Sequence, residues 1–226
     1  MRDLVYPVFQ PIYDLKTEQP AWYEALARLT GDSSCSGHGP LLKLGEQYGF
    51  VSHIDQAMLH HVAAALVELH LPVAVNVSTK TVEHHQDEIF AFLSQRPGIG
   101  KHLVWEITET RTPLDVTGLI NFAVSVKRFG SKLAVDDFGS GYWDESFVAL
   151  LEPDLIKTAW GNAGMIEAIR LARKYGAEVV VECIEDEESL ETLKQLPVRY
   201  AQGFHLGRPM PLGFHLGTGT EVVQCA

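Results

Sequence analysis

Segments that favour β-strands alternate with segments that favour α-helices along almost the whole chain. The expected strands are 8–15, 22–29, 73–78, 103–108, 132–137, 154–158, 178–182 and 199–205. The expected helical segments are 41–71, 80–95, 114–129, 144–151, 163–175 and 186–195. This alternation indicates parallel βα units, because two parallel strands need a crossover connection between them.

Two architectures hold such units, a closed barrel and a doubly wound open sheet. Eight expected strands suit the barrel, and apolar runs such as Leu133-Ala134-Val135 fit strands buried on both faces. An open sheet usually carries a glycine-rich phosphate loop, and neither GxGxxG nor a Walker sequence occurs. The sequence therefore predicts an α/β fold, a TIM-like (β/α)8 barrel. It should form a single domain over 1–217, with a mobile tail over 218–226.

Charge and cysteine content limit the partners and the compartment. A formal charge of −11 argues against binding duplex nucleic acid, which needs Lys and Arg to neutralise many phosphates. It leaves a small phosphorylated ligand open, because bound cations can invert the local field. Cys35, Cys183 and Cys225 are widely spaced and form no CxxC, as in reduced cytosolic proteins. With no signal segment or apolar run of membrane-spanning length, we expect a cytoplasmic protein without a membrane partner.

Oxygen-bearing side chains end five of the apolar runs. They are Glu24, Asn76, Glu106, the pair Asp136-Asp137, and Glu182. The carboxyl ends of barrel strands meet at one face, and hard divalent cations prefer oxygen ligands. The pattern therefore predicts one shared divalent-metal site, as in a metallohydrolase. Asn76 alone would more often be a turn residue.

The adjacent acids Asp136 and Asp137 need a special backbone to share a site. Alternation along a regular strand would send them to opposite faces. Both reach one site only if the strand ends there and the chain turns, which Gly139 and Gly141 permit. The alternative is a turn without function, but it leaves unexplained the cost of placing two carboxylates directly after a buried apolar run. Asp136 is then the natural bridging ligand of a two-metal site with ions ~3.5–4 Å apart.

Three more charged residues follow expected strands. Lys157 could neutralise the carboxylates or orient and deprotonate a water, and a surface lysine is the plain alternative. Glu109 and Glu185 each lie three residues after a strand-end glutamate. Glu185 has an alternative role in the acidic first turn of the next helix. Gln202 is by residue type more often a surface residue.

In this order, the motifs resemble the EAL-domain family of cyclic di-GMP phosphodiesterases, from about Tyr6 to Pro211. The segments that carry the resemblance are Phe9-Gln10-Pro11-Ile12, Tyr23-Glu24-Ala25-Leu26-Ala27-Arg28, Asn76-Val77-Ser78, Glu106-Ile107-Thr108-Glu109, Asp136 to Tyr142, Leu155-Ile156-Lys157, Glu182 to Glu185 and Gln202-Gly203-Phe204. Each motif is weak alone, but eight in order are specific. The resemblance implies a TIM-like barrel with one strand reversed. It also implies hydrolysis of cyclic di-GMP to linear pGpG with two Mg²⁺ or Mn²⁺ ions.

The resemblance also implies a role for each matching residue. The metal ligands would be Glu24, Asn76, Glu106, Asp136, Asp137 and Glu182. The residues supporting catalysis would be Lys157, acting on the nucleophilic water, together with Glu24, Glu109, which would brace the loop after Asp137, and Glu185. The residues at the substrate would be Gln10, Leu26, Arg28, through a phosphate, and Gln202, which also supports the site. Because Ca²⁺ prefers longer and looser bonds than Mg²⁺, we expect Ca²⁺ to fill this site and inhibit.

The chain departs from the family's usual pattern near the site. Lys157-Thr158-Ala159 stands where Lys-Ile-Asp is usual, and Trp143 to Ser146 replaces a Ser-Ser-Leu-like run. Cys183 stands where Gly is usual, and 159–177 is shorter. The changed loop borders the family's dimer interface, so we expect a monomer or weak homodimer. A cyclic di-GMP receptor without turnover and a protein-binding module are the alternatives to the enzyme, which the retained ligand set favours.

Overall fold

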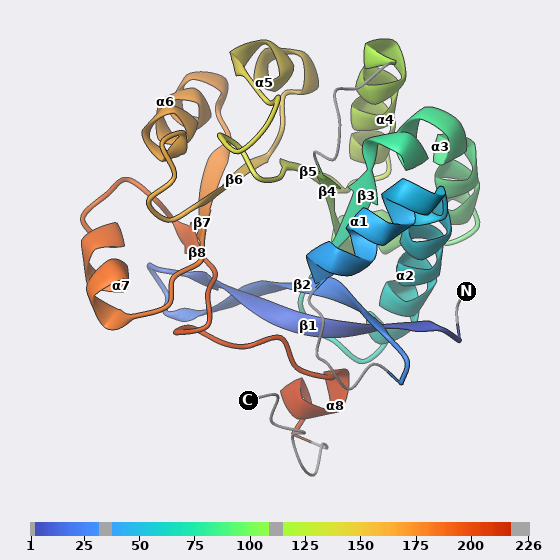
Figure 1. The fold of residues 1–226 in the computed structure, drawn as a ribbon, viewed down its shortest axis with the longest axis horizontal. Helices are drawn as coiled ribbons and strands as arrows, with labels where there is room; N and C mark the ends of the chain where they lie inside the picture. Colours follow the sequence, from blue (N-terminus) through green and yellow to red (C-terminus); the bar gives the residue numbers. More distant parts are fainter. Residues whose placement is uncertain (1–2, 32–37, 109–114, 218–226) are drawn as a thin grey trace.

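The computed structural model describes residues 3–31, 38–108 and 115–217; the expected tail and Glu109 lie outside these ranges. Within them, strands β1 to β8 close into one barrel in chain order. The strands are β1 Val5–Asp14, β2 Gln19–Leu29, β3 Val73–Ser78, β4 Leu103–Thr108, β5 Lys132–Val135, β6 Leu155–Ala159, β7 Glu178–Glu182 and β8 Tyr200–Ala201. The helices are α1 His38–Tyr48, α2 Val51–Ala65, α3 Thr79–Ser94, α4 Val116–Arg128, α5 Glu145–Leu151, α6 Met165–Tyr175, α7 Glu187–Leu193 and α8 Leu212–His215, with a short 3-10 helix, η1, at Ile99–His102. Figure 1 shows α2 to α7 around the outside of the strands.

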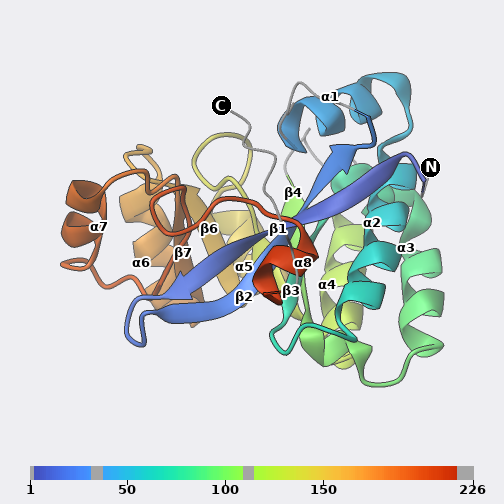
Figure 2. The same cartoon turned by 90° about the horizontal axis from the view of Figure 1, so that it is seen from below.

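Strand β1 is the reversed strand of the barrel. It pairs antiparallel with both β2 and β8, whereas every pair from β2 to β8 is parallel. A short connection over 15–18 joins β1 to β2, and such a connection fits an antiparallel hairpin but not a parallel crossover. Figure 2 shows this long hairpin crossing the molecule, with α8 against β1. The predicted TIM-like barrel with one reversed strand is confirmed.

Two expected elements differ from the structure. The expected helix 41–71 is two helices, because Gly49 adopts a φ of 78° between α1 and α2. The expected strand 199–205 is wrong beyond Ala201. There Gly203 packs so closely on Ile184 that a Cβ would lie 2.0 Å from the Ile184 carbonyl oxygen. The His205 amide then donates to that oxygen at 3.0 Å, so the chain turns over the end of β7.

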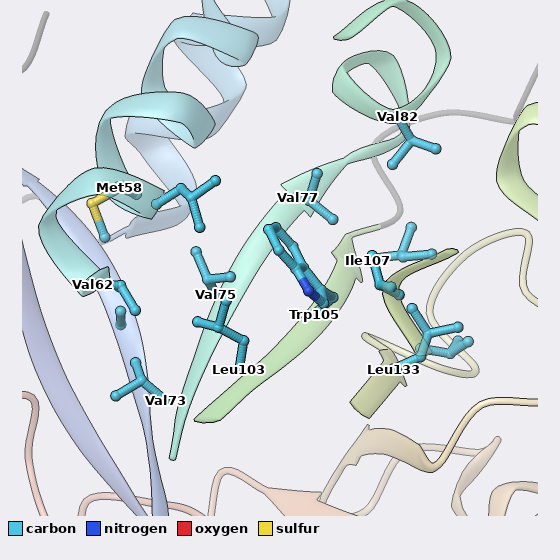
Figure 3. Packing of buried hydrophobic residues seen from close by; sticks show 14 of the residues in the cluster. Met58, Val62, Val73, Val75, Val77, Val82, Leu103, Trp105, Ile107 and Leu133 are labelled. Atoms are coloured by element: carbon cyan, nitrogen blue, oxygen red, sulfur yellow. The ribbon is translucent and has the colours of Figure 1, made fainter. Parts of the chain in front are cut away.

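The apolar side chains of the strands form two layers. Those that face outward pack under the helices, as Val73, Val75 and Val77 of β3 do beside Met58 and Val62 of α2 (Figure 3). Those that face inward fill the barrel with one residue from each strand: Ile12, Trp22, Ala74, Val104, Ala134, Leu155, Val180 and Tyr200. Each large side chain buried here contributes about 1.5–3 kcal/mol. The inner layer closes the barrel beneath its mouth.

A buried carboxylate fixes the end of β3. Asp55 of α2 accepts hydrogen bonds from the amide and hydroxyl of Ser78, each at 2.9 Å, and from the Thr81 hydroxyl at 2.6 Å. Burial raises the pKa of Asp55 to about 6 despite these donors. The network joins α2, β3 and the start of α3, and it therefore holds the strand that carries Asn76.

Candidate metal centre

A polar layer lies directly above the apolar layer inside the barrel. A polar residue lies two places after the inner apolar residue of each of β2 to β8, within the strand or, after β5 and β8, one residue past its end. On reversed β1 the polar residue lies two places before the apolar one. These residues are Gln10, Glu24, Asn76, Glu106, Asp136, Lys157, Glu182 and Gln202. Because side chains alternate along a strand, a two-residue step keeps them on the same inner face. The structure thus brings together eight of the residues singled out in the sequence.

Lys157 lies at the centre of this layer, with four carboxylates around its ammonium. Its Nζ donates a hydrogen bond to Glu106 Oε2 at 2.8 Å. Nζ also lies 3.0 Å from Glu182 Oε1, 3.1 Å from Asp136 Oδ1 and 3.4 Å from Glu24 Oε2. The Lys157 side chain is only 1% exposed, so the plain alternative of a surface lysine is wrong.

Burial and mutual repulsion perturb Glu106, Asp136 and Glu182. Burial, followed by the neighbouring carboxylates, raises the pKa of Asp136 to about 6 and that of Glu182 to about 8, although Lys157 acts in the opposite sense. The pKa of Glu106 is raised well above its usual value for the same reasons. The pKa of Lys157 is raised too, because the attraction of the four carboxylates outweighs burial. Strongly shifted pKa values of this kind cluster at functional sites.

Two amide side chains hold Glu24 in place. Asn76 Nδ2 donates to Glu24 Oε1 at 2.9 Å, and Gln202 Nε2 donates to Glu24 Oε2 at 2.7 Å. Gln202 Nε2 also lies 3.2 Å from Gln10 Oε1, and Gln10 Nε2 donates to the Gly207 carbonyl at 3.0 Å. Gln202 is thus a buried support for Glu24, linked through Gln10 to the loop after β8.

Asp137 joins the site because the chain turns at that residue. Strand β5 ends at Val135, and Asp137 takes a left-handed φ of 54°. The turn comes at Asp137 and at Gly139, whose φ is 90°. As a result, carboxylate oxygens of Asp136, Asp137 and Glu182 lie within 4.8 Å of one another. The two adjacent aspartates therefore do reach one place, as the sequence predicts.

The donor set fits divalent cations. Among the described residues, Asn76 Oδ1 and Glu106 Oε1 are buried oxygens that accept no hydrogen bond. The acid cluster, defined as Glu24, Glu106, Asp136, Asp137 and Glu182, carries five negative charges when ionised. Lys157 balances one of these, and two divalent cations would balance the other four. Oxygen-only ligands suit Mg²⁺, Mn²⁺ or Ca²⁺.

The remaining predicted residues lie around this centre. Leu26 and Arg28 share the face of β2 that carries Glu24 and are half-buried farther along the strand. Burial lowers the pKa of Arg28, and the Glu24 charge opposes that shift. Glu185 is exposed in the loop after β7. Burial raises the pKa of the Cys183 thiol, and the charges of Glu182 and Glu185 raise it further. Glu109 lies outside the described residues.

Sequence reasoning missed two residues that support the Asp137 turn, Thr158 and Asn162. The Thr158 hydroxyl donates to the Phe138 carbonyl at 2.9 Å. Asn162 Nδ2 donates to the Ser140 hydroxyl at 2.8 Å. A turn former such as Asn162 between two glycines predicts a loop, but nothing in one sequence indicates which loop it contacts.

The fold and this oxygen-rich mouth define a class, the barrel proteins with a divalent-metal centre at the carboxyl ends of their strands. The chain belongs to the EAL domain family, whose model matches residues 2–209. None of the helices that the structure describes has both the length and the apolar character that crossing a membrane requires.

The chain is similar to a protein named as a cyclic di-GMP phosphodiesterase and to one named for its EAL domain. The chain is 25% identical over 222 residues to the cyclic di-GMP phosphodiesterase PdeF of Escherichia coli, covering 90% of this chain and 30% of PdeF. It is 28% identical to the EAL-domain protein YkuI of Bacillus subtilis, covering 92% of this chain and 55% of YkuI. The chain thus spans about a third and about half of the length of these curated relatives.

Solved structures of relatives superpose on the whole barrel. The PaMucR phosphodiesterase in complex with c-di-GMP matches with a TM-score of 0.80 and 25% identity, covering 93% of both chains. The YkuI protein in complex with substrate c-di-GMP and calcium matches with a TM-score of 0.79 and 27% identity, covering 92% of this chain and 55% of YkuI.

Proposed function

We propose that this chain is a cyclic di-GMP phosphodiesterase that opens the cyclic dinucleotide to linear pGpG with two Mg²⁺ or Mn²⁺ ions. The observation that carries the proposal is the acid cluster around Lys157 at the barrel mouth. The names of PdeF and PaMucR support the reaction, and the c-di-GMP complexes support the ligand.

The proposed ligands fall into two groups that share Asp136. Glu24, Asn76, Glu106 and Asp136 would hold one ion. Asp136, Asp137 and Glu182 would hold the second. When bound, the ions would lower the pKa of water and stabilise the attacking and leaving oxygens of an in-line displacement. Without them, the net negative charge of the mouth would repel a phosphodiester anion.

The product fixes which bond breaks. Linear pGpG carries a 5′-phosphate and a free 3′-hydroxyl, so the phosphorus atom parts from a ribose 3′-oxygen. The water oxygen bonds to phosphorus, and the departing 3′-oxygen gains a proton. We assign Lys157 to orienting the water and holding charge. Its raised pKa keeps the ammonium protonated among the carboxylates, and cations on the same carboxylates would lower that pKa.

Residues on the first two strands would bind the dinucleotide. Arg28 offers a planar fork of donors that suits a phosphate, and Leu26 offers apolar surface beside it. Gln10 lies at the same mouth, linked to Glu24 through Gln202. With these residues at the ligand and the acid cluster at the reacting phosphate, binding and hydrolysis would be separable functions.

A receptor without turnover is the second candidate, and Ala159 favours it. Ala159 pairs with Glu182 across β6 and β7, and it follows Lys157 by two residues on the same face. It therefore removes an acidic group that the family usually has beside the second ion. Chromatography of cyclic di-GMP incubated with the protein and Mg²⁺ or Mn²⁺ separates the two candidates. Formation of pGpG supports the enzyme, and binding of cyclic di-GMP without product supports the receptor. The absence of both product and binding supports a protein-binding module.

Calcium is expected to bind and to inhibit. Mg²⁺ needs near-octahedral bonds of ~2.0–2.1 Å, whereas Ca²⁺ takes looser bonds of ~2.3–2.6 Å. A site that positions water between closely spaced ions should therefore fill with Ca²⁺ and misplace the water. We expect hydrolysis with Mg²⁺ or Mn²⁺, loss of it on adding Ca²⁺, and retained binding of cyclic di-GMP in Ca²⁺. Full activity in Ca²⁺ alone would contradict the assignment.

We also expect a monomer or a weak homodimer. Asp144 and Glu145 stand where the family tends to have small or apolar residues, and unpaired carboxylates are costly in an interface core. Here Asp144 caps α5, and Glu145 pairs with Arg170 and Lys174 of α6. Light scattering at micromolar concentration, with and without metal and cyclic di-GMP, measures the assembly. A dimer that persists in every condition contradicts this expectation.

A further inference from the structure

The turn that presents Asp137 is anchored at several points to the same chain. We define the Asp137 turn as residues 137–140. Its first anchor is β6, because the Phe138 amide donates to the Lys157 carbonyl at 2.9 Å and the Thr158 hydroxyl donates to the Phe138 carbonyl. Phe138 itself is buried in the core. The turn is therefore fixed to the strand that carries Lys157.

The second anchor is the segment just before α6. The backbones of Gly139 and Gly164 approach so closely that a Cβ on Gly164 would lie 2.5 Å from the Gly139 Cα. Asn162 bridges the two sides. Its Nδ2 donates to the Ser140 hydroxyl at 2.8 Å, and its Oδ1 accepts from the Gly164 amide at 2.7 Å. Asn162 and Gly164 thus form a close-packed support for the turn.

The third anchor lies on the far side of the turn. Trp143 is buried and packs edge-on against Phe147 of α5, with ring centroids 5.2 Å apart. Asp144 caps α5 through the amide of Ser146 at 2.8 Å. Both ends of the turn are therefore held, while Asp137 keeps a left-handed backbone that a non-glycine residue adopts only at a cost.

We propose that Asn162, through its bond to Ser140, is a positioning residue that holds Asp137 at the second ion within a single chain. The inference rests on the proposed two-metal site and deepens it. A ligand whose turn is already fixed loses less conformational freedom when it binds an ion. Breaking the Asn162–Ser140 bond should therefore weaken the second ion selectively, with little effect on the first ion or on the barrel.

The test is a titration of metal-free protein with Mn²⁺, in which the electron paramagnetic resonance signal of free Mn²⁺ measures how many ions are bound. Wild type should bind two ions. Ser140→Ala and Asn162→Ala should each raise the dissociation constant of one ion by about 2- to 10-fold, the range for loss of one hydrogen bond. The double variant should weaken the ion no more than Asn162→Ala alone, because Asn162→Ala already removes the Asn162–Ser140 bond. Gly164→Ala should weaken the same ion more, since its new Cβ pushes on Gly139.

A matched control is Ser94→Ala, which removes an exposed hydrogen bond from Ser94 to the Phe90 carbonyl on α3. It should leave both ions and the thermal midpoint unchanged. Equal weakening of both ions with a lower thermal midpoint would mean a general structural role and would overturn the inference. So would unchanged binding in the Ser140 and Asn162 variants, or a wild type that binds fewer than two ions.

Activity separates this inference from the proposed function. Two-ion binding that depends on Asn162, in a protein that forms no pGpG, would sustain the positioning role and reject the phosphodiesterase. If the protein forms pGpG and its ion binding does not change in the Asn162 variant, the phosphodiesterase is supported and the positioning role is rejected.

Discussion

Glu24→Ala is expected to abolish hydrolysis of cyclic di-GMP while leaving the barrel folded. Glu24 is buried at the mouth, where it would complete the first ion's ligand set with Asn76, Glu106 and Asp136. Loss of an ion that stabilises the transition state by several kcal/mol corresponds to a rate loss on the order of 10²–10⁴-fold. The readouts are pGpG formation by chromatography and Mn²⁺ binding by the metal-free protein.

The fold should survive because Glu24 repels its neighbours when no cation is bound. The Glu24 charge raises the pKa of Glu106, Asp136 and Glu182. Removing it relieves that repulsion, and this gain offsets part of the cost of leaving the Asn76 and Gln202 amides without their acceptor, so the metal-free variant should stay folded with a midpoint close to that of wild type. The added stability that Mg²⁺ gives to wild type should shrink in the variant, because an ion stabilises only a state that binds it.

Two further variants sharpen the result. Glu24→Gln keeps the shape and an acceptor for Asn76 or Gln202, so its loss of activity would be due to the missing charge. Glu68→Ala removes an exposed glutamate just past α2 and should have no effect on turnover or ion binding. Unchanged turnover in a well-folded Glu24→Ala protein would reject the ligand assignment.

The barrel and most of its mouth could be predicted because both follow from local pattern. An inner apolar residue followed two places later by a polar one, as in Ala74 and Asn76, is visible in the sequence as an apolar run with an oxygen at its end. Parallel strands bring such ends together at one face of the barrel, independently of the length and conformation of the loops. The reversal of β1 came from the resemblance, because periodicity carries no strand direction.

The parts that could not be predicted depend on contacts distant in sequence. The short β8 follows from the packing of Gly203 on the Ile184 backbone. The support for the Asp137 turn depends on Asn162, 22 residues away from Ser140. Lys157 could be placed at the mouth, but only the structure reveals that its ammonium lies among four carboxylates.

Lys157→Met is expected to give the second large effect, and it should affect stability and turnover in different ways. The ammonium is buried in contact with four carboxylates of the acid cluster. Removing one partner of a buried ion pair typically costs about 3–5 kcal/mol, because the remaining charges are uncompensated. Metal-free Lys157→Met should therefore unfold at lower urea concentration than wild type. Mg²⁺ or Mn²⁺ should restore much of the difference.

The pH dependence of this loss has a defined sign. Lys157 opposes the upward shift of the pKa of Asp136, which is about 6 with the lysine present, so that pKa should rise in the variant. A carboxyl whose folded pKa is raised contributes stability below its unfolded pKa and loses it as pH rises through the folded value. Metal-free Lys157→Met should therefore lose stability more steeply than wild type between about pH 6 and pH 8, because the Asp136 contribution in wild type is already lost by about pH 6. Urea titrations across that range measure the slope, and exposed Lys132→Met on β5 is the matched control.

Turnover should fall on the order of 10²–10³-fold in ion-loaded Lys157→Met, the range for loss of one fixed group that stabilises charge in the transition state. Binding of cyclic di-GMP in Ca²⁺ should persist, since the ions and Arg28 would still hold the phosphates. Isothermal titration in Ca²⁺ and chromatography in Mn²⁺ give the two readouts on one protein. A variant that loses binding yet keeps its turnover per bound substrate would place Lys157 at the ligand instead of at the water. A metal-free variant as stable as wild type would mean that the carboxylates take up protons without cost, and the charge balance that favours two ions would then lose its physical basis.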